Sequence, residues 1–297
     1  MTTHSPLATP SATIAALQRW GLSTNKSLGQ HFLIDDGVIG RILRLADLSA
    51  GESVLEVGPG IGTLTLALLQ AGARVTAIEK DEKLLIALAE LRARYPQQFS
   101  FLHADALSLL SAPSELAGTA PTALVANLPY AVAATIVLDC FLHLPAIASA
   151  TVMVQAEVAA RMAAQPGGKD YGAYSVKLQL LAQPKGSFKV SRQSFLPPPR
   201  VDSTVLRLDR LPDCPPADIP AAFTVIEAAF AARRKTIRNS MRSYFSAQGL
   251  APDLVDELLA AARIAPTARG ETVSVAQFCQ LGQLLTELDT DKTYKSD

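Results

Sequence analysis

Three alternating glycines stand beside an acidic residue in the first quarter of the chain. Gly58, Gly60 and Gly62 are separated by single residues, and Glu56 lies two positions before the first of them. The dinucleotide-binding pattern is G-x-G-x-x-G instead, and an acid here would repel a pyrophosphate. The pattern favours a ligand with positive charge, such as the ammonium and sulfonium groups of S-adenosylmethionine. Taken alone, the loop can also be interpreted as a tight turn between a strand and a helix.

Two further acids follow predicted strands. Glu79 ends the segment 74–79, and Asp105 comes just after the segment 99–103. In a βαβ unit, Glu79 would lie within reach of ribose hydroxyl groups, and Asp105 could accept a hydrogen bond from an adenine amino group. Glu79 could instead cap the next helix, although Asp81 is placed to do so.

The tetrapeptide Asn127-Leu128-Pro129-Tyr130 follows a fourth predicted strand, 122–126. The exocyclic amine of a nucleobase is a poor nucleophile because its lone pair is delocalised. Acceptors aimed at its hydrogens favour the geometry of attack on a methyl group. The Asn127 side chain and the Leu128 backbone offer such carbonyls, Pro129 stiffens the turn, and a base can stack on Tyr130. The alternative is an ordinary turn with a core tyrosine.

The elements that must position these residues alternate between strands and helices. Apolar runs predict strands near 53–57, 74–79, 99–103, 122–126, 150–154, 186–191 and 201–208. This order predicts an α/β fold with an open, Rossmann-like sheet whose last strand is antiparallel. A proline-rich linker at 211–216 divides a catalytic domain, 1–212, from a helical domain, 213–297. The loop 26–33 is interpreted either as a surface turn or as a flap over a ligand.

Composition restricts the partners and the compartment. Lys plus Arg and Asp plus Glu each number 27, so a nucleic-acid partner would need a local basic patch. The three cysteines lack metal-ligand spacing, which argues against zinc and fits a reducing, cytoplasmic setting. No signal peptide is evident. The uncharged stretch 116–138 is interrupted by prolines, so we expect no membrane segment.

A basic cluster lies in the second predicted domain. No acid occurs from 228 to 250, and three of the basic residues recur at helical spacing. A solvated helix face is the alternative, but phosphate contacts to RNA are favoured. The residues of this cluster are Arg233, Arg234, Lys235, Arg238 and Arg242.

Seven motifs in order resemble the KsgA-type small-subunit ribosomal RNA adenine N6,N6-dimethyltransferases. The resemblance spans residues 24 to 285. The matching stretches are KSLGQHFL at 26–33, LEVGPGIGTLT at 55–65, IEKD at 78–81, HADAL at 103–107, NLPY at 127–130, FLPPPRVDS at 195–203 and RRKTIRNSM at 233–241.

The resemblance implies methylation of two adjacent adenosines in a hairpin near the 3′ end of 16S rRNA, by a cytoplasmic monomer. Phe195 is implied to form a second aromatic wall for the target base, beside the tetrapeptide 127–130. His31 stands where asparagine is common in the family, and histidine can still donate a hydrogen bond. The implied S-adenosylmethionine contacts are His31, Leu33, Gly58, Glu79, Asp105 and Asn127.

Three other functions compete with this one. A related antibiotic-resistance methyltransferase of large-subunit rRNA shares the core, but the 233–241 motif favours the small-subunit enzyme. A DNA adenine methyltransferase is disfavoured because many carry proline where Leu128 stands. A factor that serves small-subunit assembly without catalysis is the third alternative, and this role could coexist with catalysis.

Overall fold

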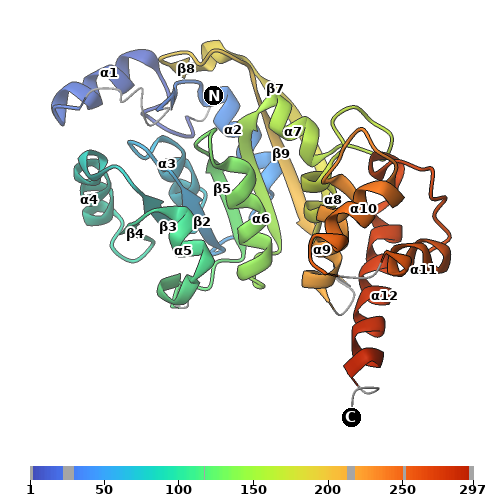
Figure 1. Cartoon of the computed structure of the whole chain (residues 1–297). Helices are drawn as coiled ribbons and strands as arrows, with labels where there is room; N and C mark the ends of the chain where they lie inside the picture. The colour runs from blue at the N-terminus through green and yellow to red at the C-terminus, as the bar shows by residue number, and fades with distance from the viewer. Residues whose placement is uncertain (1–2, 23–29, 117, 213–217, 250–251, 294–297) are drawn as a thin grey trace. The chain divides into compact units, whose positions relative to one another are not determined.

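The computed structural model describes residues 3–22, 30–116, 118–212, 218–249 and 252–293. The chain divides into two compact units (Figure 1). Unit 1 comprises residues 1–159 and 184–210, and unit 2 comprises residues 160–183 and 211–297. This division falls close to the predicted boundary at 212 and 213 but also assigns 160–183 to the second unit. The boundary itself stays a prediction.

A seven-stranded sheet organises unit 1 in the order β4-β3-β2-β5-β6-β9-β7. The strands from β4 to β6 are parallel, and β9 runs antiparallel to β6. The α/β class and the antiparallel last strand are therefore confirmed. The strands are β2 Ser53–Val57, β3 Arg74–Glu79, β4 Phe99–His103, β5 Ala123–Asn127, β6 Ser149–Gln155, β7 Ala182–Val190 and β9 Ser203–Arg210.

Helices surround this sheet (Figure 1). Apolar side chains cover β2 on both faces, as expected of a central parallel strand. Asp35 caps α2 by accepting a hydrogen bond from the Val38 amide. The helices are α1 Pro10–Arg19, α2 Asp36–Ala46, α3 Thr63–Gln70, α4 Leu85–Arg94, α5 Ala106–Ser111, α6 Ala133–His143 and α7 Ala156–Met162, the last crossing from unit 1 into unit 2.

Two short strands form a second sheet that the sequence did not indicate. β1, Phe32–Leu33, pairs antiparallel with β8, Phe195–Leu196. This pairing joins the end of the motif at 26–33, whose residues 26–29 lie outside the described ranges, to the start of the proline-rich motif at 195–203, although more than 160 residues separate the paired strands in the chain. The last long strand, β9, lies between β6 and β7 rather than at the sheet edge, because β7 takes the edge position.

Unit 2 is helical, as predicted for the C-terminal region. Its helices are α8 Ala173–Gln179, α9 Ile219–Phe230, α10 Ile237–Ser246, α11 Asp253–Ala261 and α12 Val275–Thr293. α10 begins at Ile237, because Thr236 caps it by accepting from the Asn239 amide. Residues 233–235 therefore lie in the turn before the helix.

Candidate active site

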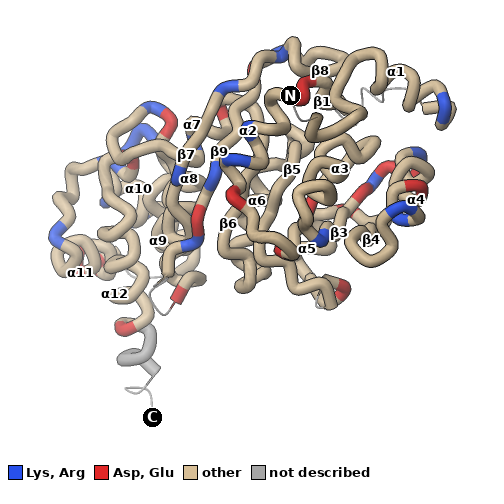
Figure 2. The backbone as a smooth tube through the Cα atoms, turned by 180° about the vertical axis from the view of Figure 1, so that it is seen from behind, with Lys and Arg blue, Asp and Glu red and all other residues tan. Residues whose placement is uncertain are grey.

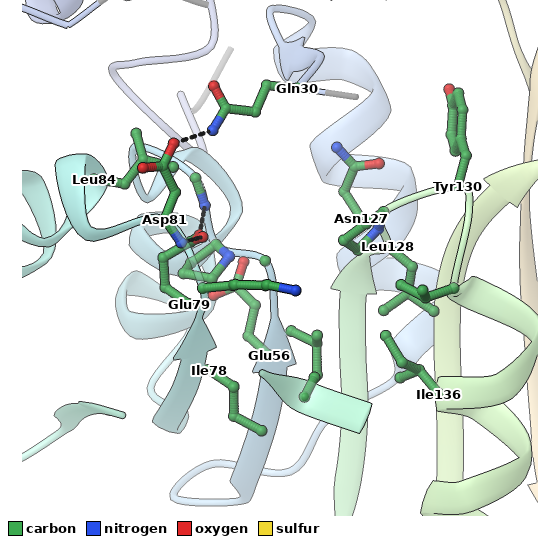
Figure 3. Close-up of a pocket in the computed structure, with 18 of the residues that line it drawn as sticks. Gln30, Glu56, Ile78, Glu79, Asp81, Leu84, Asn127, Leu128, Tyr130 and Ile136 are labelled. Carbon is green, nitrogen blue, oxygen red and sulfur yellow. Dashed lines mark hydrogen bonds between the residues drawn. The ribbon is translucent and has the colours of Figure 1, made fainter. Parts of the chain in front are cut away.

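A cavity of about 330 Å³ lies at the carboxyl ends of β2, β3 and β5. Ligands in open α/β sheets bind at this edge. In Figure 3, Glu79 and Asp81 lie on one side of the cavity, and Asn127 and Tyr130 lie on the other. Of the predicted site residues in unit 1, the cavity lining includes His31, Leu33, Gly58, Glu79, Asp105, Asn127, Leu128, Pro129 and Tyr130.

The glycine loop needs its glycines for conformation and for space. Gly58, Gly60 and Gly62 have φ angles of 70°, 62° and 83°, in the left-handed region that side chains disfavour. A Cβ at Gly62 would lie 2.2 Å from a Leu91 methyl carbon. The loop leads into α3, whose N-terminus has no side-chain cap, so backbone N–H groups are presented there.

Glu79 ties the end of β3 to the glycine loop. Its Oε1 accepts from the Asp81 amide at 2.8 Å, and its Oε2 accepts from the Gly60 amide at 3.3 Å. Burial raises the pKa of this carboxyl. Asp81 caps the short helix after β3, Glu82–Leu84, and accepts a 2.7 Å bond from the Gln30 side chain. Glu79 is thus not needed as the cap.

Glu56 does not point freely at the loop as the sequence suggested. It is 1% exposed, and its Oε2 accepts a hydrogen bond of 2.6 Å from the Thr65 hydroxyl. Burial raises the pKa of this carboxyl to about 8, and the charge of Glu79 adds to the effect. Burial therefore favours the neutral form of Glu56 relative to an exposed carboxyl.

Asp105 is already engaged on both carboxylate oxygens. Its Oδ1 caps α5 by accepting from the Leu107 amide at 3.0 Å, and its Oδ2 lies 2.7 Å from the Lys80 ammonium. The hydrogen bond from Lys80 holds the pKa of Asp105 below its usual value. An adenine amino group would have to share Oδ2 with Lys80, a partner that the sequence analysis missed.

Asn127 ends β5 with its side chain at the cavity. Its Nδ2 donates to the His31 carbonyl at 3.4 Å, and Figure 3 shows its oxygen turned toward Tyr130. The Leu128 amide donates to the Met153 carbonyl, which fixes the turn against β6. Tyr130 is half-buried, and its hydroxyl shares a 2.7 Å hydrogen bond with Ser203. A carbonyl acceptor and an aromatic face thus lie together at one side of the cavity, and their contact with an adenine stays a prediction.

Phe195 does not reach the cavity. Its side chain is 2% exposed, packs in the core of unit 1, and stands opposite Leu33 in the pairing of β1 with β8. Phe195 is thus not among the residues that line this cavity, and its role as a second aromatic wall stays a prediction.

The basic cluster of unit 2 separates into two groups. Arg234 and Lys235 are exposed, and no ion pair involves them among the described residues. Arg238 and Arg242 both bind the carboxylate of Asp256 from α11, Arg238 through two bonds of 2.7 Å. Arg233 lies 3.7 Å from Glu271. Figure 2 shows basic and acidic residues interspersed over both units, in keeping with the zero net charge.

The described residues contain neither a metal-binding cluster nor a membrane-spanning helix. No group of His, Cys, Asp and Glu in those ranges is arranged to hold a metal ion. Within the same ranges, no helix combines the length and apolarity needed to cross a membrane.

Comparisons with known proteins agree with the geometry. The family model described as ribosomal RNA adenine dimethylase matches residues 21–287. Ribosomal RNA small subunit methyltransferase A of Streptomyces griseus is 42% identical over 276 residues, covering 91% of this chain and 92% of the relative. The Mycobacterium avium protein of the same name is 44% identical over 266 residues, covering 87% of this chain and 81% of the relative.

Solved structures show the same fold. A dimethyladenosine transferase from Plasmodium falciparum superposes with a TM-score of 0.73 at 21% identity, covering 88% of this chain and 98% of that one. The 23S rRNA methyltransferase ErmE superposes with a TM-score of 0.61 at 29% identity, covering 86% of this chain and 99% of that one. Because the family model and relatives above 40% identity cover most of the chain, this protein belongs to the ribosomal RNA adenine dimethylase family.

Proposed function

We propose that this protein transfers methyl groups from S-adenosylmethionine to N6 of two adjacent adenosines in a hairpin near the 3′ end of 16S rRNA. The dimethyladenosine products follow from two transfers to each amine. The observation that carries the proposal is the joint presence of Asn127, Tyr130 and Glu79 around one cavity. Relatives that cover about nine-tenths of the chain are named as small-subunit methyltransferases.

The cavity fits S-adenosylmethionine, which the family and the fold imply. Its volume of about 330 Å³ lies in the range of ligand pockets. Glu79 is fixed beside the glycine loop, where its carboxylate can also accept from ribose hydroxyls. Ile78 and Leu107 supply apolar lining. When bound, the cofactor supplies an electrophilic methyl group on a sulfonium.

The protein's contribution to the transfer is to hold the amine. The Asn127 and Leu128 carbonyls would accept the two N6 hydrogens and favour a tetrahedral nitrogen. These two residues would hold N6 with its lone pair directed at the methyl group that the bound cofactor would supply, and the electron pair of the broken carbon–sulfur bond would stay with the cofactor. The alkylated amine then releases a proton to water. After the first transfer one hydrogen remains, so the amine must rotate before the second.

Contacts with RNA phosphates form a separate part of this proposal. We assign them first to Arg234 and Lys235, which are exposed in the turn before α10. Arg233, Arg238 and Arg242 would join them only by leaving or sharing their acidic neighbours.

A methylation assay with the small and the large ribosomal subunit as alternative substrates tests the proposed function. Purified small and large subunits from cells that lack this protein would be incubated with it and with S-adenosylmethionine. Mass mapping should locate dimethyladenosine at two neighbouring positions of 16S rRNA, with a monomethyl intermediate at short times. Modification of 23S rRNA instead would establish the large-subunit alternative, which the likeness to ErmE keeps open. A reaction that ends at monomethyladenosine would exclude dimethylation.

Asn127→Ala separates chemistry from binding in the same assay. Loss of one preorganised acceptor should slow single-turnover methylation roughly 10²–10³-fold, while small-subunit binding persists. The thermal unfolding midpoint serves as the control for folding. A variant within a few-fold of the parent would remove Asn127 from the activation of N6.

A further inference from the structure

Two aromatic rings face each other at the side of the cavity where Asn127 ends β5. The ring centroids of His31 and Tyr130 are 5.8 Å apart, and their planes differ by 27°. Both residues line the cavity. The His31 carbonyl also accepts the Asn127 side chain at 3.4 Å. The two rings therefore form opposite faces of a slot beside the group proposed to activate the amine.

Both rings are held in place from the proline-rich segment 195–203. The Tyr130 hydroxyl shares a 2.7 Å hydrogen bond with Ser203, which is fully buried at the start of β9. His31 Nδ1 donates to the Pro197 carbonyl at 2.7 Å. These bonds fix the two rings by their polar atoms and leave their faces directed at each other. The segment thus positions both sides of the slot while its own aromatic residue, Phe195, packs in the core.

On the basis of the proposed function, we propose that His31 stacks on the target adenine opposite Tyr130. A flat base between two rings needs them roughly 7–8 Å apart, about twice the carbon–carbon contact distance. The slot must therefore widen by roughly 1–2 Å from its present 5.8 Å. Stacking on both faces would offset the cost of taking the adenine out of its helix.

This assignment differs from a cofactor contact in what the side chain must supply. A hydrogen bond to the cofactor needs a polar group, which asparagine also has. Stacking needs a planar conjugated ring, which phenylalanine has and asparagine lacks. His31→Asn and His31→Phe therefore give opposite results under the two assignments. His143, at the end of α6, lies outside the cavity lining, and His143→Asn is the matched control.

The experiment uses the full-length protein and a hairpin RNA with the 16S 3′-end sequence. 2-Aminopurine replaces one target adenine, and S-adenosylhomocysteine is present. Fluorescence reports the change in stacking of that base, and calorimetry reports affinity for S-adenosylmethionine. Small-subunit methylation gives KM and kcat, and thermal unfolding shows that each variant is folded.

We expect His31→Asn to lose most of the fluorescence response. Its kcat/KM for small subunits should fall roughly 5- to 160-fold, the range of one base–aromatic stacking contact. Its cofactor affinity should stay within about twofold, and His31→Phe should retain the fluorescence response.

Three results would overturn the proposal. The first is a His31→Asn variant with the same fluorescence response as the parent. The second is a His31→Asn variant that loses only affinity for S-adenosylmethionine. The third is an equal loss in the Asn and Phe variants, which would make the bond to Pro197 the important feature. If the parent fails to methylate 16S rRNA, the proposed function is wrong. A base response that the parent shows and only His31→Asn loses would support the slot even then.

Discussion

The Glu56 carboxyl is buried beneath the glycine loop and binds a proton more readily in the folded chain than in the unfolded one. Burial raises its pKa from 4.5 to about 8. For an acid with a raised folded pKa, the stabilising contribution is complete below the unfolded pKa and is lost as pH rises through the folded pKa. Between about pH 5 and pH 9, Glu56 should therefore reduce the free energy of unfolding as pH increases.

Glu56→Gln removes this titrating group and keeps a side chain of similar size. The free energy of unfolding of the parent should fall relative to that of the variant across this pH range. The difference should be on the order of a few kcal/mol. Urea unfolding at several pH values measures it, and other titrating groups largely cancel in the comparison. Parallel pH profiles for the two proteins would show that Glu56 is ionised in both states.

At the scale of single elements, β6 carries an unsatisfied hydroxyl. Thr151 is 1% exposed, and its Oγ1 has no hydrogen-bond partner in the described part of the chain. Thr151→Val keeps the branched shape and removes this buried polar group. We expect the free energy of unfolding to rise by about 1 kcal/mol. Thermal or urea unfolding measures the change. A variant that is less stable than the parent would show that the Thr151 hydroxyl forms a hydrogen bond in the folded protein.

The turn before α10 gives a second prediction at this scale. Arg234→Ala with Lys235→Ala should weaken binding of the 16S hairpin RNA and leave cofactor affinity unchanged. If each residue contacts one phosphate, the slope of log affinity against log salt should shrink by about 1.4–1.8. Fluorescence anisotropy over a salt series is the assay. Unchanged affinity and slope would make the turn a solvated surface.

Asp256→Asn tests whether the two arginines that pair with Asp256, Arg238 and Arg242, contribute to RNA binding. The substitution removes the charge that holds Arg238 and Arg242. If these arginines also reach phosphates, RNA affinity should rise and its salt dependence should steepen. An affinity equal to that of the parent would confine RNA contacts to the turn, and unfolding of the variant serves as the control.

At the scale of the whole molecule, unit 2 is assembled from two separate stretches of chain. Tyr171 is fully buried, donates a 3.0 Å hydrogen bond to the Val273 carbonyl, and meets Phe230 edge to face. Lys177 pairs with Glu227 on α9. Residues 160–183 therefore supply part of the core that the predicted helical domain, 213–297, would lack.

A fragment of residues 213–297 should unfold without a cooperative transition. The same region joined by a flexible linker to residues 160–183 should unfold cooperatively, because the linker restores Tyr171 and α8. Circular dichroism during heating compares the two, and Tyr171→Ala in the linked form is the control. A cooperative transition in the short fragment would establish 213–297 as an independent domain.

The sequence by itself determined the strands of the sheet, the glycine loop, and the placing of Glu79 and Asn127 at strand ends. These features depend on local patterns: apolar runs of strand length, positive φ angles that glycine tolerates, and polar residues at strand ends. Parallel strands bring their carboxyl ends to one edge, so residues distant in sequence meet there without further information. The order of the motifs sufficed for the family.

Tertiary structure alone decided which side chains face which. The pairing of β1 with β8 places Phe195 opposite Leu33, and the Phe195 ring is buried in the core. The tertiary structure also decided that Asp256 forms an ion pair with Arg238 and that Lys80 forms one with Asp105. His31 meets Tyr130 because Pro197 and Ser203 hold both rings. Such contacts join segments far apart in the chain, and no periodicity within one segment encodes them.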